Sequence, residues 1–328
     1  MQSPDSAGEQ PSIGSPAIRH ATLEHVMTGT TPHQSKLWHI ATPGLFVILW
    51  STGFIGAKFG LPYAEPFTFL LWRFGFVTVL LVALALLMRA PWPASPAQVA
   101  HIAMSGFMVN GLYIGGVFSA IHQGVPTGIV SLIAGLQPLL TAIVAGRLLG
   151  EKVSRRQWVG FGLGLVGVLL VLMDKISFAG GSRLGVLMAV FALFGMTAGT
   201  LYQKRYCAHL DLLSGGAIQI GASALAMAVL APLFETMKVR WTGAFVFAMV
   251  WLVLVLSLGA ISLFNLLIRR GEASRVASLF YLVPPVTSLL AFLLFGERLG
   301  ITALTGMLVT VTGVALAVRR PKTAKALG

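Results

Sequence analysis

Charged residues, and acids in particular, are scarce in this chain of 328 residues. Charged residues make up 10% of the sequence, with 10 Asp and Glu against 23 Lys and Arg, whereas soluble domains usually carry about 25%. Hydrophobic residues account for 56%, and the mean hydropathy is +0.85. So few charges cannot cover a water-facing surface, so the composition excludes an ordinary soluble domain and indicates an integral membrane protein.

Cysteine, metal-ligand clusters and phosphate-binding motifs are also missing. The single Cys207 excludes an intrachain disulfide. No G-x-x-x-x-G-K-[ST] loop occurs, so the sequence shows no ATPase of its own. Four histidines lie near the N-terminus at scattered spacing that does not predict a metal site: His20, His25, His33 and His39. We therefore expect no cofactor, no metal and no catalytic residues.

Apolar residues come in long blocks rather than on one face of each helix. A helix needs about 20 mostly apolar residues to cross the hydrocarbon layer, and residues 66–88 hold a single charge, Arg73. The spans must be helical because lipid offers the backbone no hydrogen-bond partner, and a barrel would need alternating segments of about 10 residues. Ten blocks predict ten transmembrane helices: 40–60, 66–88, 99–122, 126–147, 155–173, 184–203, 214–234, 243–267, 275–295 and 301–318.

Basic residues gather at the span ends, mostly on one side of the expected membrane. If the N-terminus is cytoplasmic, the segments 147–156, 269–275 and 319–325 hold many of the Lys and Arg residues on that side. The positive-inside rule then places both termini in the cytoplasm, and we expect a multi-pass protein of a bacterial inner membrane. The same distribution argues against nucleic acid as the partner behind the net charge of +13. We expect residues 1–39 to be a disordered cytoplasmic tail and 319–328 a basic cytoplasmic tail.

An internal repeat organises the spans. A shift of 146 residues aligns Gly53 with Gly199, Pro138 with Pro284, and Gly150-Glu151 with Gly296-Glu297. One offset holds from the first span to the last of each half, which predicts a duplication. Each half has five spans, an odd number, so the second half must cross the membrane in the opposite direction. Inverted repeats of this kind are typical of secondary transporters.

Several of these stretches resemble EamA-type carriers of the drug/metabolite transporter superfamily. The similar stretches are Trp50-Ser51-Thr52-Gly53-Phe54 through Lys58, Pro66 through Arg73-Phe74, Gln137-Pro138 through Gly150-Glu151-Lys152, and Pro284-Pro285 through Gly296-Glu297-Arg298. The resemblance covers about 40–320 and implies repeats at 40–173 and 184–318. It also implies an all-α membrane fold of ten helices around a central cavity, and usually efflux of amino acids, metabolites or drugs.

Two glycine motifs have a structural and a functional interpretation. Gly162-x-Gly164-x-x-Gly167 matches the dinucleotide fingerprint but lies inside an apolar span without the required preceding strand, so we expect these glycines to let helices approach closely. Gly150-Glu151 and Gly296-Glu297 follow the fourth span of each half. They fit a helix stop with an acid near the next helix, and a gate or an ion site is the alternative.

Prolines near the middle of two spans predict helix kinks. Pro138 and Pro284-Pro285 remove backbone donors inside apolar segments, and transporter binding sites are commonly built beside broken helices. A kink that only shapes packing is the alternative. The Gln137 amide, and the Tyr281 hydroxyl one turn before Pro284, favour a binding role.

Other polar and amphipathic residues inside spans complete the candidate cavity. Charges within the membrane mark either a solute path or a paired structural site, so Arg73 is assigned to one of these, with Glu65 as a possible partner. Trp50 and Tyr113 sit near mid-span rather than in the interfacial aromatic belt. The candidate lining residues for an aromatic or amphipathic solute are Trp50, Ser51, Asn110, Tyr113, Gln137, Tyr202 and Tyr281.

The sequence thus favours a secondary transporter, most plausibly an exporter of a small metabolite, amino acid or drug-like solute by alternating access. Its partners would be that solute and the lipid bilayer. All ten acids fall in tails, loops or near span ends, so no proton or sodium site is predicted. A non-transporting scaffold or receptor is the alternative, and a membrane enzyme is a weaker one because no nucleophile, base or ligand cluster is present.

Overall fold

The structure is a computed structural model that describes residues 32–148, 155–178, 182–207, 210–260, 263, 279–297 and 300–318. The chain divides into two compact units, 1–42 and 43–328, and the contacts that follow belong to the second. Helices supply the regular structure of these described ranges, where an isolated bridge between Ala64 and Val239 is the one β-type pairing.

Each of the ten predicted spans contains helix, and most boundaries agree within a few residues. Residues 32–39, which we assigned to the tail, are helical and begin α2. The elements are α2 (Pro32–Gly60), α3 (Pro66–Leu87), α4 (Pro96–Gly106), η1 (Phe107–Ile114), α5 (Gly115–His122), α6 (Thr127–Ala134), α7 (Gln137–Leu148), α8 (Arg155–Phe178), α9 (Arg183–Tyr206), α10 (Leu212–Phe234), α11 (Gly243–Val250), η2 (Trp251–Ala260), η3 (Phe280–Leu282), α14 (Val283–Phe295) and α15 (Ile301–Val318).

Several of these helices are long and apolar enough to cross a membrane. Within the described residues they are Pro66–Leu87, Pro96–His122, Arg183–Tyr206 and Leu212–Phe234. Shorter apolar helices make up much of the remaining spans. A span of about 20 residues covers the hydrocarbon thickness. Some of the shorter pieces belong to spans that are interrupted or continue as non-α helix, and the others lie within the continuous helices α8 and α15.

The interruptions fall at equivalent places in the two halves. The third span contains π-helical η1, 107–114, and the eighth contains π-helical η2, 251–260. The fourth span breaks after Ala134 and resumes at Gln137, while the ninth passes through the 3-10 turn η3 before α14. Each interruption corresponds to its counterpart through the 146-residue shift.

Proline explains why the fourth and ninth spans resume where they do. Pro138 is the second residue of α7, and Pro284 and Pro285 lie in the first turn of α14. A first-turn residue has no intrahelical use for its N–H, so proline costs nothing there, whereas it would break a continuous helix. The prolines therefore fit the start of α7 in the fourth span and the start of α14 in the ninth.

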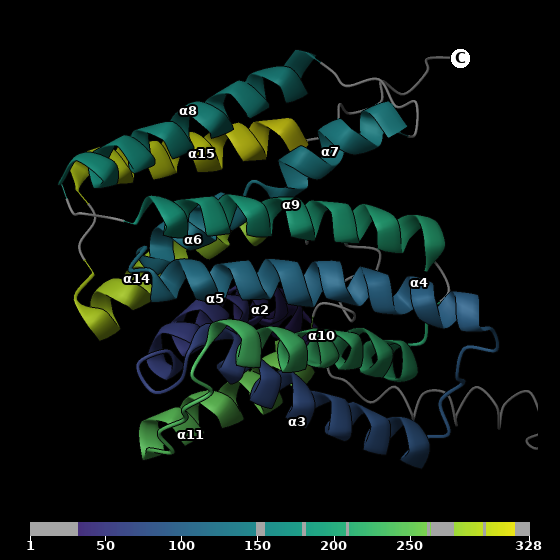
Figure 1. Cartoon of the computed structure of the whole chain (residues 1–328). Coiled ribbons are helices and arrows are strands. Elements are labelled where there is room, and N and C mark those ends of the chain that lie inside the picture. Colours follow the sequence, from purple (N-terminus) through teal and green to yellow (C-terminus); the bar gives the residue numbers. More distant parts are fainter. Residues whose placement is uncertain are drawn as a thin grey trace, which may run out of the picture. The chain divides into compact units, whose positions relative to one another are not determined.

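Helices from the two halves pack in pairs, which Figure 1 shows for α8 with α15 and for α9 with the α4–η1–α5 span. Glycines make the closest approaches. A Cβ added at Gly167 would lie 2.4 Å from the Gly306 oxygen, and one at Gly313 would lie 2.7 Å from the Gly160 oxygen. Gly164 is buried in the same contact, whereas Gly162 faces outward with nothing near it. The fingerprint-like glycines are thus largely packing residues.

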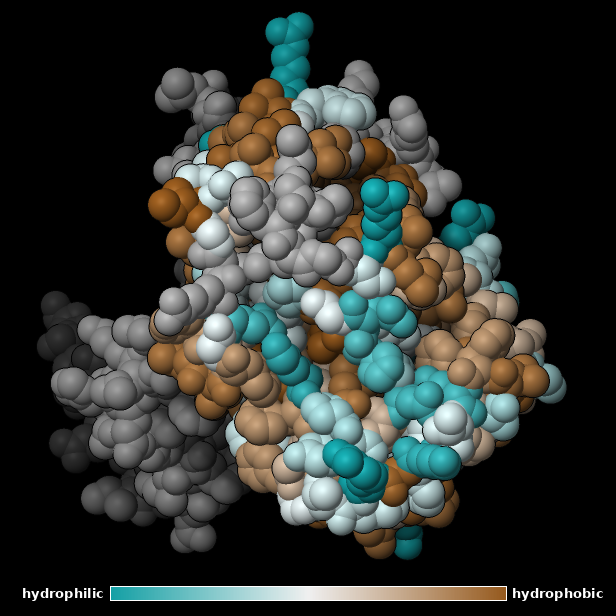
Figure 2. Space-filling model, turned by 60° about the vertical axis from the view of Figure 1, so that its left-hand side comes forward, coloured by the Kyte–Doolittle hydropathy of each residue, from teal (hydrophilic) through white to brown (hydrophobic). Residues whose placement is uncertain are grey.

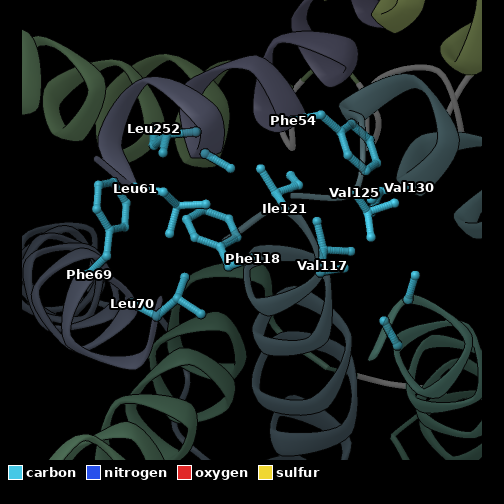
Figure 3. Packing of buried hydrophobic residues seen from close by; sticks show 14 of the residues in the cluster. Phe54, Leu61, Phe69, Leu70, Val117, Phe118, Ile121, Val125, Val130 and Leu252 are labelled. Atoms are coloured by element: carbon cyan, nitrogen blue, oxygen red, sulfur yellow. The ribbon is translucent and has the colours of Figure 1, made fainter. Parts of the chain in front are cut away.

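The core of the second unit is an apolar cluster that joins the two halves. Figure 3 shows the rings of Phe69 and Phe118 beside Leu61, Leu70 and Leu252. The Phe69 and Phe118 ring centroids are 5.4 Å apart. Many large apolar side chains are exposed, including Val79, Leu225 and Leu308, as expected for helices whose outer surface meets lipid. Figure 2 shows one face, on which hydrophilic residues gather between such apolar ones.

Candidate functional site

A pocket lies between the two halves, beside both broken helices. Its enclosed cavity measures about 20 Å³, and about 350 Å³ of empty space, open solvent included, lies along the lining. None of its described lining residues is charged. The lining residues, which define the central pocket, are Trp50, Phe54, Tyr113, Ser131, Ala134, Gly135, Gln137, Pro138, Met196, Phe280 and Val283.

The central pocket is lined by residues that the 146-residue shift relates to one another. Trp50 corresponds to Met196, Ala134 to Phe280, and Gln137 to Val283, and all six line the pocket. Equivalent residues of the two halves thus line the same pocket. In chemistry the pairs are unequal, because the first half supplies the indole and the amide where the second half supplies a thioether and an isopropyl group.

One wall of the pocket carries a hydrogen-bonded amide. The Gln137 Nε2 atom donates to Thr141 Oγ1 at 3.0 Å and to Thr200 Oγ1 at 3.4 Å. The Thr200 hydroxyl donates in turn to the Met196 carbonyl at 2.7 Å. Position 137 follows directly after the helix break, so its side chain projects beside an interrupted backbone. Both amide hydrogens of Gln137 are therefore held by the protein.

The opposite wall is aromatic. The ring centroids of Trp50 and Phe280 lie 5.1 Å apart at 88°, and those of Phe46 and Phe280 lie 5.5 Å apart at 86°. Edge-to-face contacts of this kind are favourable and fix ring orientation. The ring of Phe280 is placed by η3, the irregular turn of the ninth span. The rings offer a flat apolar surface to a solute.

The other sequence-predicted residues are not gathered in this pocket. Ser51 is fully buried and donates to the Val47 and Val283 carbonyls. The Asn110 amide donates to the Gly106 carbonyl one turn back along its own span, and the Tyr202 hydroxyl hydrogen-bonds His101 Nδ1 at 2.8 Å. The Tyr281 side chain lies outside the described residues.

Arg73 is buried but does not line the pocket. Its side chain is flanked by the rings of Phe74 and Phe118, with guanidinium-to-centroid distances of 6.0 and 5.9 Å. Its Nε atom has no hydrogen-bond partner within the described ranges. Glu65, considered as its partner, instead accepts hydrogen bonds from the Thr236 backbone N–H and hydroxyl, so that pairing is not formed.

An ion pair links three pocket-lining spans at one end of the bundle. Lys58 at the end of α2 pairs with Glu297, which follows α14. Glu297 also accepts from the Thr127 backbone N–H at 3.2 Å and from its hydroxyl at 3.1 Å, at the start of α6. A carboxylate at a helix N-terminus satisfies a free N–H and the helix dipole. We call Lys58, Thr127 and Glu297 the end latch.

Local chemistry places Glu297 at this point. Gly296 ends α14 in the left-handed conformation, with φ of 65°, which glycine adopts without strain. The chain then reverses, and the next residue's carboxylate reaches α6. The helix-stop interpretation of Gly296-Glu297 thus describes the local structure, and the carboxylate also joins the two halves. The corresponding Gly150-Glu151 lies outside the described residues.

Apolar pocket residues were missed by sequence reasoning. Phe280, Met196 and Val283 look like any lipid-facing residue of a span, because hydrophobicity alone does not tell which side of a helix faces a cavity. The repeat contained a usable signal, since shifting Trp50, Ala134 and Gln137 by 146 gives these residues. In the described part of the chain, no three His, Cys, Asp or Glu residues lie close enough to hold a metal ion.

Comparisons with known proteins agree with this architecture. The chain is 27% identical over 289 residues to "Uncharacterized transporter YvbV" of Bacillus subtilis, covering 85% of this chain and 91% of that protein. It is 25% identical over 282 residues to a "Probable amino-acid metabolite efflux pump" of Escherichia coli, covering 82% and 91%. It is 25% identical over 252 residues to "Uncharacterized inner membrane transporter YedA" of Escherichia coli, covering 77% and 81%.

A solved crystal structure shares the fold, with a TM-score of 0.60 at 22% identity over 86% of this chain and 98% of the other. The model of the EamA-like transporter family matches twice, at residues 42–173 and 183–319. Those two matches account for nearly all of the membrane spans. The chain therefore belongs to the EamA-like transporter family and is a multi-pass membrane transporter, not an enzyme.

Proposed function

We propose that this transporter exports a small solute without net negative charge, which binds in the central pocket and is released by alternating access. The observation that carries the proposal is the pairing of repeat-related residues on the pocket wall: Trp50 with Met196, Ala134 with Phe280, and Gln137 with Val283. If the halves are inverted, a site on their shared axis is equally placed toward both membrane faces. Exchanging the conformations of the two halves would then open it to one side or the other.

The end latch is the contact that such a cycle must break. It joins α2, α6 and α14, and each of these helices or the turn before it contributes pocket residues. The Glu65 and Glu235 contacts at the same end join α3 and α10, which contribute none. With the N-terminus in the cytoplasm of a bacterial cell, the end latch closes the pocket toward the outside. Export across an inner membrane agrees with the names of two relatives, one an efflux pump and the other an inner membrane transporter.

A flux screen tests the transport step. Purified protein in lipid vesicles, loaded with a panel of amino acids and other metabolites, should release a subset of them, measured with and without a pH gradient. Trp50→Ala removes the aromatic wall and should lower that release at least tenfold without loss of membrane insertion. Trp92→Ala, at an exposed tryptophan between α3 and α4, is the matched control. Solute binding without release by the wild type would favour a receptor or scaffold instead.

Cysteine labelling tests the latch. In a Cys207→Ser background, which removes the chain's one cysteine, Ala134→Cys places a thiol in the pocket. We expect Glu297→Gln to raise labelling by an impermeant maleimide from the outer side about tenfold, because an ion pair and a helix cap are lost together. Glu65→Gln is the control at the same end. Equal labelling in both variants would remove the end latch from the mechanism.

A further inference from the structure

Two polar side chains of the central pocket, Gln137 and Ser131, offer only hydrogen-bond acceptors to a solute. The Thr200 hydroxyl has one proton, which it gives to the Met196 carbonyl, so toward Gln137 it can only accept. The atom of Gln137 that faces Thr200 must therefore be the nitrogen. This fixes the orientation of the amide and leaves Gln137 Oε1 as the atom available to a solute, because no described residue donates to it.

Two further groups show the same polarity. The Ser131 hydroxyl donates to the Gly128 carbonyl at 2.8 Å, so only its lone pairs remain. Tyr113 also lines the pocket, and its hydroxyl has no hydrogen-bond partner among the described residues. A buried tyrosine hydroxyl usually finds a partner, and this group can both accept from and donate to a solute. It is the one hydroxyl in the pocket whose proton is not already used.

The aromatic wall adds to this polarity. The faces of aromatic rings carry partial negative charge and attract cations and N–H groups, and the pocket includes the rings of Trp50, Phe54 and Phe280. Among the lining residues that the structure describes there is no Lys, Arg or His. A carboxylate or phosphate entering the pocket would lose its hydration and meet no charged side chain among the described lining residues, which is unfavourable.

Resting on the proposed transport function, we infer that the central pocket selects solutes that have a hydrogen-bond-donating head, an amine above all, on a flat apolar body, and rejects solutes with a free carboxylate or phosphate. Gln137 is the specificity-determining residue, since its carbonyl oxygen accepts from the head group. The second half cannot substitute for it, because Val283 occupies the equivalent position. Amides and esters of amino acids fit this description better than the free amino acids do.

Three matched probes test the inference: phenylalaninamide, phenylalanine and 3-phenylpropanoate, with affinities measured by titration calorimetry on the full-length protein in detergent. Phenylalaninamide should bind at least tenfold more tightly than 3-phenylpropanoate, with phenylalanine between them. Gln137→Met keeps the side-chain length and should weaken phenylalaninamide binding about tenfold while leaving 3-phenylpropanoate unchanged. Gln137→Glu, which adds a negative charge, should tighten phenylalaninamide binding. Gln98→Leu, at an exposed glutamine of α4, should change nothing.

Equal or tighter binding of 3-phenylpropanoate would overturn the inference, as would an equal loss of all three affinities in Gln137→Met. Absence of binding by every probe would overturn it as well. The vesicle screen separates these results from a failure of the transport function itself. Release of carboxylate solutes in that screen would agree with the transport function and reject only the inferred preference for hydrogen-bond-donating solutes. Absence of any release would reject the transport function.

Discussion

The second helix of each half begins with the same set of hydrogen-bond donors, but different carboxylates accept from them. In α10, Asp211 accepts from the backbone N–H groups of Leu213 and Ser214, and from the Ser214 hydroxyl at 3.2 Å. In α3, Glu65 stands at the equivalent position and makes no such contact. Glu235, from the end of α10, accepts instead from the backbone N–H groups of Phe67 and Thr68 and from the Thr68 hydroxyl.

The difference shows how a duplicated sequence can come to depend on its other copy. One half caps its helix locally, as an isolated helix would. The other half has its cap supplied by the partner half, and Glu65 returns the contact by accepting from Thr236. The same local requirement therefore stabilises a single helix in one half and the interface between the halves in the other.

A second contrast lies deeper in the same helices. Gly106 of the third span meets the backbone of Gln219, and a Cβ at Gly106 would lie 2.3 Å from the Gln219 Cα. The 146-residue shift turns this pair into Leu252 and Arg73. In the first pair the helices touch through their backbones, and Gln219 donates to Ser105. In the second, a fully buried leucine belongs to η2, which contacts α3, the helix of Arg73.

The largest expected effect comes from adding a side chain at Gly106, where the two helices touch through their backbones. Gly106→Ala forces a side chain into the Gln219 backbone, which cannot move aside, so we expect a loss of about 3 kcal/mol of stability. The measurement is the thermal midpoint for retention of a monodisperse size-exclusion peak in detergent. Gly75→Ala, where nothing lies within 4 Å of the added Cβ, is the control. Equal midpoints would mean that the backbone contact is dispensable.

Loss of the Glu235 cap should destabilise the protein more than loss of the Asp211 cap. Glu235→Ala leaves two backbone donors and one hydroxyl without an acceptor, so we expect a loss of about 2 kcal/mol. Asp211→Ala removes a local cap of the ordinary kind, with an expected loss of about 1 kcal/mol. The same thermal assay measures both. A larger loss for Asp211→Ala would contradict the dependence of the first half on the second.

The smallest expected effect is a gain. Arg73 is 5% exposed and its Nε lacks a partner, so a methionine of similar length should stabilise the protein by about 1 kcal/mol. Arg73→Gln, which copies the residue of the second half, tests the same site with a neutral polar group. A loss of several kcal/mol in Arg73→Met would show that the guanidinium is bound to a group that compensates its charge.

Much of the fold could be predicted from the sequence because the membrane limits the choices. Apolar runs of sufficient length had to be helices, and Pro138 and Pro284 had to interrupt them. The π-helical turns at 107–114 and 251–260 gave no such signal, since Phe-Met-Val-Asn-Gly-Leu-Tyr-Ile reads as ordinary span sequence. Their position depends on how the third and eighth spans pack against their neighbours.

The site was less predictable because rotation about a helix axis decides which side faces the pocket. Trp50, Tyr113 and Gln137 were proposed from their polarity at mid-span, and the structure places all three on the pocket wall. Tyr202 was proposed on the same grounds, but its hydroxyl forms a hydrogen bond with His101. Its ring centroid lies 4.7 Å from that of Tyr206. The spacing of residues shows Tyr206, one turn on in α9, but it cannot show His101, which lies on α4.

The wide turns η1 and η2 also bear on how these helices can move. A π turn holds one residue more than an α turn, and such insertions are frequent at functional sites. The surplus residue can pass to the adjacent turn while the helix stays intact, and each side chain that it passes rotates by about 100°, the angle per residue of an α-helix. Tyr113 lies within η1, so its hydroxyl could swing into or out of the cavity by a sliding of register, without bending the span.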